Sequence, residues 1–163
     1  MSRSRQRPRP NPEEPRQRDL FEVLYYSLSG RTRKLAETIA AELGVKAEDV
    51  RQRSRLVKDS YVFLGSGCYG GKPGRRLTQF IARNDFTGRR VALFGSSADG
   101  RSVHLKTLES LLKAKGALIA GSFHCRGQAF FFLNRGQPDS EDLGRAAAFA
   151  RDLGPGTHTN AGQ

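Results

Sequence analysis

One short stretch of the chain carries residue types that bind a phosphate group. It reads Ser27-Leu28-Ser29-Gly30-Arg31-Thr32 and lies between an apolar run and an amphipathic segment. A phosphate monoester needs several hydrogen-bond donors that converge on one small dianion, and free amides at a helix start supply them with a favourable dipole. The hydroxyl groups of Ser27, Ser29 and Thr32 add donors, and Gly30 lets the backbone approach closely. We interpret the stretch as a candidate phosphate loop; an ordinary capped turn is the alternative.

Two later stretches of small and polar residues also follow apolar runs. The first is Ser66-Gly67-Cys68-Tyr69-Gly70, in which Tyr69 offers either a ring for stacking or an anchor for the loop. We expect Cys68 to be a small packing residue and not a reactive thiol. The second stretch, Ser96-Ser97-Ala98-Asp99, contains no aromatic residue.

The elements that must position these loops alternate between strand-like and helix-like patterns. Short apolar runs predict five strands, at 21–26, 45–50, 61–65, 90–94 and 117–123. Apolar residues at helical spacing predict four helices, over 32–43, around Leu77–Ile81, over Leu105–Leu112 and after Asp139 as an N-cap. We expect the last helix to turn one apolar face inward, with Leu143, Ala146, Ala147, Ala150 and Leu153.

Strands that are buried on both faces and separated by helices predict a parallel sheet between two helical layers. The predicted fold class is α/β, a doubly wound five-stranded parallel sheet with helices on both faces. In such sheets ligands bind beyond the carboxyl ends of the strands. The three polar stretches follow the first, third and fourth predicted strands, so we expect them to meet at one edge.

The ordered set of three loops resembles that of the flavodoxins. The phosphate loop of that family has the form [Ser/Thr]-x-[Ser/Thr]-Gly-x-Thr, and residues 27–32 match every defined position. Leu64–Gly71 and Ala92–Asp99 are similar to the second and third flavin loops, and 136–139 to the start of the last helix. The resemblance covers residues 20–153 and is to the short-chain type. It implies strand order 2-1-3-4-5, FMN as cofactor, and no catalytic side chain or metal.

Two features depart from the family pattern. The chain has no Trp, and its third loop has no aromatic residue to cover the flavin. His104 is the side chain that could approach this open face, although we expect it to be a solvated helix residue. The chain is also basic, with a formal net charge of +12, whereas the family's electron carriers are usually acidic. This charge favours redox partners with acidic docking faces.

The composition suggests one folded domain with two tails. Residues 1–18 are rich in Arg, Pro and Gln and are expected to be a disordered basic tail. A flavodoxin-like domain is expected over 19–153 and a flexible tail over 154–163. No apolar run suits a signal peptide or a membrane span. The two cysteines, Cys68 and Cys125, are not expected to form a disulfide, so a cytoplasmic location is predicted.

Three functions remain open on the sequence alone. The leading hypothesis is an FMN-binding protein that carries electrons between redox partners. The second is an FMN-dependent oxidoreductase that uses a nicotinamide donor and a quinone acceptor, favoured by the missing aromatic residue. The third is a non-redox module whose basic tail binds nucleic acid or an anionic membrane surface.

Overall fold

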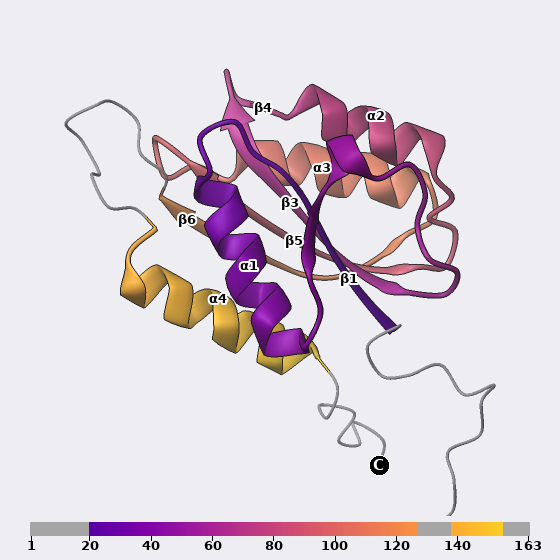
Figure 1. Cartoon of the computed structure of the whole chain (residues 1–163). Helices are drawn as coiled ribbons and strands as arrows, with labels where there is room; N and C mark the ends of the chain where they lie inside the picture. The colour runs from indigo at the N-terminus through magenta and orange to yellow at the C-terminus, as the bar shows by residue number, and fades with distance from the viewer. Residues whose placement is uncertain (1–19, 127–137, 155–163) are drawn as a thin grey trace, which may run out of the picture.

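A twisted sheet lies between two layers of helices in the computed structural model, which describes residues 20–126 and 138–154 (Figure 1). The strands are β1 (Phe21–Tyr26), β2 (Ala47–Asp49), β3 (Tyr61–Tyr69), β4 (Lys72–Pro73), β5 (Arg90–Ser97) and β6 (Leu118–Arg126). The helices are α1 (Arg31–Leu43), the short 3-10 helix η2 (Val50–Gln52), α2 (Arg75–Arg83), α3 (Val103–Ala114) and α4 (Ser140–Leu153). Residues 1–19, 127–137 and 155–163 lie outside the described part, and with them the predicted N-terminal tail and all of the predicted C-terminal tail except Gly154.

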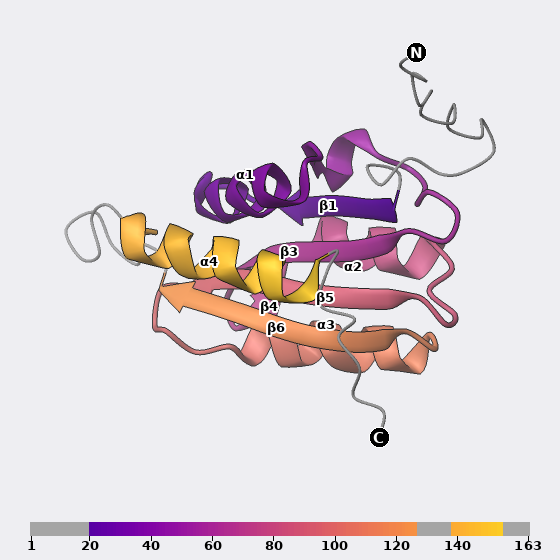
Figure 2. The same ribbon diagram turned by 90° about the horizontal axis from the view of Figure 1, so that it is seen from below.

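The strand order confirms the predicted fold class. Five parallel strands are ordered β2-β1-β3-β5-β6, which is the predicted 2-1-3-4-5 when the small strand β4 is left out of the count. Helices α1 and α4 cover one face and α2 and α3 the other (Figures 1 and 2). Each side of the sheet therefore has its own apolar core. No helix in the described residues is long and apolar enough to cross a membrane.

The amphipathic patterns of the helices explain how the two layers form. On one face, Leu35 and Ile39 of α1 and Ala146 and Ala150 of α4 are fully or almost fully buried in the same cluster. Leu143 and Leu153 pack against that cluster while partly exposed, so four of the five predicted inward residues of α4 are confirmed; Ala147 is half-buried and is not part of the cluster. On the other face, the buried side chains are Leu77, Phe80 and Ile81 of α2 and Leu105, Leu108 and Leu112 of α3.

The prediction of a second loop at 66–70 was wrong, because most of these residues belong to a strand. β3 continues through Tyr69 and turns back at Gly70 and Gly71 to pair with β4 in an antiparallel hairpin. Both glycines have positive φ, 61° and 77°, as the tight two-residue turns of hairpins require. β5 and β6 likewise extend beyond the predicted ends, to Ser97 and Arg126, whereas β2 is shorter than predicted.

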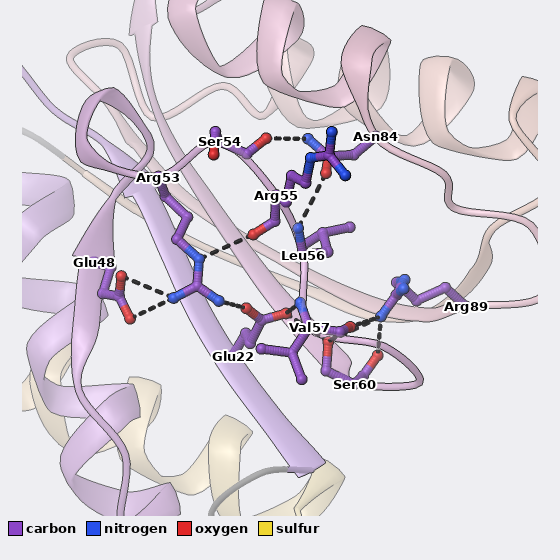
Figure 3. A network of polar contacts seen from close by, with 10 residues as sticks. All are labelled: Glu22, Glu48, Arg53, Ser54, Arg55, Leu56, Val57, Ser60, Asn84 and Arg89. Atoms are coloured by element: carbon purple, nitrogen blue, oxygen red, sulfur yellow. Dashed lines mark hydrogen bonds and ion pairs between the residues drawn. The ribbon is translucent and has the colours of Figure 1, made fainter.

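A polar network ties the sheet together at the end opposite the predicted loops (Figure 3). Its centre is Glu22, a buried carboxylate near the start of β1. Glu22 accepts hydrogen bonds from Arg53 Nη2 at 2.5 Å, from Ser60 Oγ at 2.5 Å and from the Val57 amide at 3.0 Å. Arg53 also holds Glu48 through both carboxylate oxygens. The network thereby fixes the irregular segment between η2 and β3 against the sheet.

The start of α4 gives a first prediction. Asp139 accepts a hydrogen bond from the Asp142 amide at 2.9 Å, and the Asp142 carboxylate accepts one from the Asp139 amide, which completes a capping box. Replacing Asp139 with alanine should lower the free energy of unfolding by about 1 kcal/mol, because the Asp142 amide loses its acceptor. Urea unfolding of both proteins measures the difference. Asp139→Asn, which keeps an acceptor, should lose less than half as much, and an equal loss would contradict the capping explanation.

Candidate functional site

The three predicted segments meet at the carboxyl ends of β1, β3 and β5. The Leu28 amide donates a hydrogen bond to the Tyr69 hydroxyl at 3.0 Å, which joins the first segment to the second. The hydroxyls of Thr32 and Ser96 lie 3.3 Å apart, which joins the first to the third. These contacts span sequence separations of 41 and 64 residues. The fold thus brings together residues that the sequence places far apart.

The phosphate loop presents an open helix start. Gly30 is the N-cap of α1 and has a φ of 82°, and no side chain caps the helix. The amides of Thr32 and Arg33, in the first turn of α1, have no intrahelical acceptor and so can serve as donors. Ser27 Oγ accepts a hydrogen bond from the Gly30 amide at 3.0 Å, which leaves its own proton free to be donated. A Cβ atom added at Gly30 would have nothing within 4 Å, so the space beside the loop is open.

The remaining residues of this loop differ in exposure. Leu28 and Ser29 are exposed, Arg31 is half-buried, and Thr32 is buried. The loop therefore has an exposed hydroxyl, that of Ser29, and two hydroxyls on its buried side, those of Ser27 and Thr32. This arrangement suits a small anion that sits on the helix start.

Residues 66–68 of the second segment are used mainly to hold the hairpin. Ser66 is fully buried, and its hydroxyl donates to the Gly67 carbonyl and accepts from the Gly74 amide. Gly67 is buried as well, and a Cβ there would come within 2.8 Å of the Tyr69 hydroxyl. Cys68 is half-buried, and burial raises the pKa of its thiol, which does not favour a reactive thiolate.

Tyr69 closes the gap between the hairpin and the phosphate loop. Besides its bond with Leu28, its ring makes an edge contact with Tyr26 at 5.7 Å between centroids. Of the two roles left open by the sequence, the anchor is the one present in this structure. Burial raises the pKa of the Tyr69 phenol, which keeps the hydroxyl protonated at neutral pH. Gly70 follows at the exposed tip of the hairpin.

The third segment combines two buried serines with two exposed residues. Ser96 and Ser97 belong to the end of β5, and the Ser97 hydroxyl donates to the Arg101 carbonyl at 2.7 Å. Ala98 and Asp99 are exposed. The Arg101 amide donates to Asp99 at 2.9 Å and thereby lowers the pKa of this carboxyl. Ala98 and Asp99 are therefore the accessible part of the segment.

His104 corrects the sequence prediction, because it is fully buried and not solvated. Its Nε2 lies 3.2 Å from the Ser66 carbonyl, which can only accept, so Nε2 carries the proton. It has room because Gly95 has no side chain: a Cβ there would be 2.7 Å from Nε2. Burial, and then the nearby His124, lower the pKa of His104 to about 4.

His124 is a residue that the sequence analysis did not single out. It lies on β6 opposite Gly95, with its ring 5.7 Å from that of His104. Its Nε2 is 2.9 Å from Ser97 Oγ, and because this hydroxyl already donates to Arg101, the imidazole donates here. Burial lowers the pKa of His124. The two neutral imidazoles thus bind one residue of each segment: His104 contacts Ser66 in β3, and His124 contacts Ser97 in β5.

The geometry fits a phosphate-bearing cofactor such as FMN at the first segment. The uncapped helix start, the left-handed Gly30 and the hydroxyls around it form a suitable donor set. In the described residues, no group of three or more His, Cys, Asp or Glu side chains could hold a metal ion. Cys68 is a half-buried free thiol and Cys125 a buried one.

Comparison with known proteins gives a relative by sequence and solved structures with the same fold. An uncharacterized protein of Methanocaldococcus jannaschii is 29% identical over 143 residues, which are 80% of this chain and 95% of the relative. Oxidised flavodoxin 1 of Bacillus cereus superimposes with a TM-score of 0.62 at 18% identity, covering 81% of this chain and 95% of that one. A short-chain flavodoxin associated with a bacterial microcompartment gives 0.60 at 20% identity, covering 82% and 96%. The similarity to these two flavodoxin structures shows the fold of the chain.

The match to a domain family shows to which family the chain belongs. The flavodoxin domain matches residues 22–124, which hold the three loop segments, the hairpin, and both His104 and His124. Because this match spans more than half of the 163 residues, the chain belongs to the flavodoxin domain family, whose cofactor is FMN.

Proposed function

We propose that this protein binds FMN at the three loop segments and carries electrons between redox partners in the cytoplasm. The observation that carries the proposal is the open start of α1, where Gly30 takes a left-handed conformation and no side chain caps the helix. A helix start built in this way, beside the carboxyl ends of β3 and β5, suits a phosphate next to a planar ring.

The residues of the chain would divide the work of binding. The amides of the first turn of α1 and the hydroxyls of Ser27, Ser29 and Thr32 would hold the phosphate. The hairpin around 66–70 and the exposed part of the third segment, Ala98 and Asp99, would flank the ring. When bound, FMN supplies the reversible transfer of electrons, and the protein orients and shields it. No side chain is required to donate or remove a proton for this task.

The charge of the chain supports an acidic partner. With 28 Lys and Arg residues against 16 Asp and Glu, the chain attracts negatively charged surfaces. The same excess of positive charge stabilises negative charge near the surface, which should raise the reduction potential of a bound flavin relative to that in acidic carriers.

A pair of glycines at the two ends of α1 tests the cofactor site. Gly30 and Gly44 have φ values of 82° and 70°, and an added Cβ would meet nothing within 4 Å at either position. Substitution with alanine therefore costs similar backbone strain at both, about 1 kcal/mol. FMN affinity, measured by quenching of flavin fluorescence, should fall more than about tenfold in Gly30→Ala. It should stay within about twofold in Gly44→Ala, since only Gly30 lies in the phosphate loop.

Two outcomes would contradict the cofactor proposal. One is a wild-type protein that shows no flavin bands and does not quench added FMN. The other is equal FMN affinity in Gly30→Ala and the wild type. Thermal unfolding of the two variants confirms that they carry a similar loss of stability, so that a difference in affinity belongs to the site.

One observation favours an enzyme as the second candidate function. The third segment, Ser96–Asp99, has no aromatic residue, and Ala98 and Asp99 are exposed. One face of a bound flavin would thus be open to a substrate. Rapid oxidation of NADPH by the purified protein with a quinone present would favour an FMN-dependent oxidoreductase over an electron carrier. A purified protein that turns over only when a second redox protein is added would favour the carrier.

A further inference from the structure

A groove of about 330 Å³ between η2 and α2 has arginine on both sides. Arg51 and Arg53 come from the η2 side, and Arg76 and Arg83 from α2. Arg76 and Arg83 are seven residues apart, so they lie on the same face of the helix. Phe80, which lies between them on that face, is 5% exposed and forms the floor. The groove is therefore narrow, with an apolar floor and positively charged walls.

The positive charge of this surface is balanced by ion pairs on the η2 side, at Arg51 and Arg53, but not on the α2 side. Residues 50–58 contain four cationic residues, residues 75–83 contain three, and neither segment contains an Asp or Glu. The neighbouring carboxylates are already engaged. Arg53 binds Glu22 and Glu48, as Figure 3 shows, and Arg51 binds Asp49 at 2.6 Å. Within the described residues, Arg76 and Arg83 are exposed and no ion pair engages either of them.

The groove adjoins the proposed flavin site. The Arg51 guanidinium donates to the carbonyl of Ser27 in the phosphate loop at 3.5 Å. It also lies 5.4 Å from the centroid of the Tyr26 ring, which in turn contacts Tyr69. Arg51 therefore lines the groove and contacts the phosphate loop with the same guanidinium group.

We propose that this groove docks a carboxylate-rich segment of the redox partner and so places the partner at the edge of the flavin. The inference rests on the proposed electron-transfer function. Arginine binds carboxylates with two parallel hydrogen bonds, as Arg51 does here with Asp49 at 3.0 and 2.6 Å. The volume fits a few side chains of a peptide but not a nucleic acid duplex. The buried Phe80 offers no ring for stacking of bases, which favours a protein segment over a single strand.

The test compares two double charge reversals in the full-length protein. Arg76→Glu with Arg83→Glu changes the groove. Lys46→Glu with Lys106→Glu changes two exposed lysines elsewhere and gives the same net charge. The probe is a short fluorescein-labelled oligoglutamate peptide, and its affinity is measured by fluorescence anisotropy at low salt. We expect the groove variant to lose about tenfold in affinity and the control to stay within about threefold of the wild type. Amide NMR shifts on peptide addition should map to η2 and α2.

Three outcomes would overturn the proposal. Equal losses in the two double variants would show attraction by net charge alone, and shifts confined to residues 1–19 would assign binding to the N-terminal segment. A single-stranded oligothymidylate that binds more tightly than the peptide, and loses more in the groove variant, would assign the groove to nucleic acid. FMN titration of the same proteins keeps the two proposals apart. A failure to bind FMN in all three proteins would reject the flavin site, while the peptide data would still decide the groove.

Discussion

Replacing Arg53 with methionine should lower the free energy of unfolding by about 3 kcal/mol, because it leaves the Glu22 carboxylate buried without its cation. The Glu22 side chain is 7% exposed and lies 2.5 Å from Arg53 Nη2. The Ser60 hydroxyl and the Val57 amide would remain as donors to Glu22, but neither carries a positive charge. A quarter of the Arg53 side chain is exposed, which keeps the expected loss near the lower end for buried pairs. Urea unfolding at neutral pH measures it.

Two further variants separate the buried contact of Arg53 from its exposed one. Glu48→Gln removes the partner that is 43% exposed and should cost less than about 1 kcal/mol. Glu22→Gln combined with Arg53→Met removes both buried charges together. It should recover at least half of the loss in Arg53→Met, because no buried charge remains unpaired. If the double variant is less stable than Arg53→Met, the packing of the Arg53 side chain, and not the unpaired carboxylate, determines the loss.

The regular elements of the fold could be predicted because each has its own local pattern. The apolar runs that became β1 and β5, and the spacing of Leu35 and Ile39 on α1, need no knowledge of the partner that they pack against. The hairpin of β3 and β4 was missed because it contains Ser66, Gly67, Gly70, Gly71 and Pro73, which favour strands only weakly on their own. Gly74, directly after β4, shows a second reason. A Cβ there would come within 2.1 Å of the Tyr26 ring, so the glycine makes room for a neighbour that lies far away in sequence.

The site could be predicted only as far as its loops. The pattern of Ser27–Thr32 identifies a helix start that suits a phosphate, and the structure places it beside the other two segments. The role of Ser66 could not be inferred, since its hydroxyl is committed to Gly67 and Gly74 by the hairpin itself. His104 lies four residues before the buried Leu108, so its helical face was a usable indication of burial. His124 had no such indication, because its contact with Ser97 depends on the pairing of β5 with β6.

The buried His104 should make the protein sensitive to mild acid. Its pKa is lowered to about 4 by burial and by His124, whereas a histidine in the unfolded chain has a pKa of about 6.5. Between these values the unfolded chain binds a proton that the folded protein does not bind. The contribution of His104 to stability is therefore complete at a pH above the pKa of the unfolded chain, and it falls as the pH drops toward 4. Between about pH 7.5 and about pH 5, His104 should lower the free energy of unfolding by about 2 kcal/mol.

Urea unfolding of wild type and His104→Gln at these two pH values tests this sensitivity. The variant should be less stable at pH 7.5, where it loses the bond to the Ser66 carbonyl, yet it should lose much less between the two pH values. This pH window isolates the histidines, because the carboxyls with lowered pKa values, Asp49, Asp85 and Asp99, destabilise the fold only in stronger acid. His124→Gln should flatten the pH dependence too, since burial also lowers the pKa of His124 and its charge lowers that of His104. If His104→Gln loses as much stability between the two pH values as the wild type does, the acid sensitivity belongs to other groups. His104 would then not take up a proton on unfolding in this pH range.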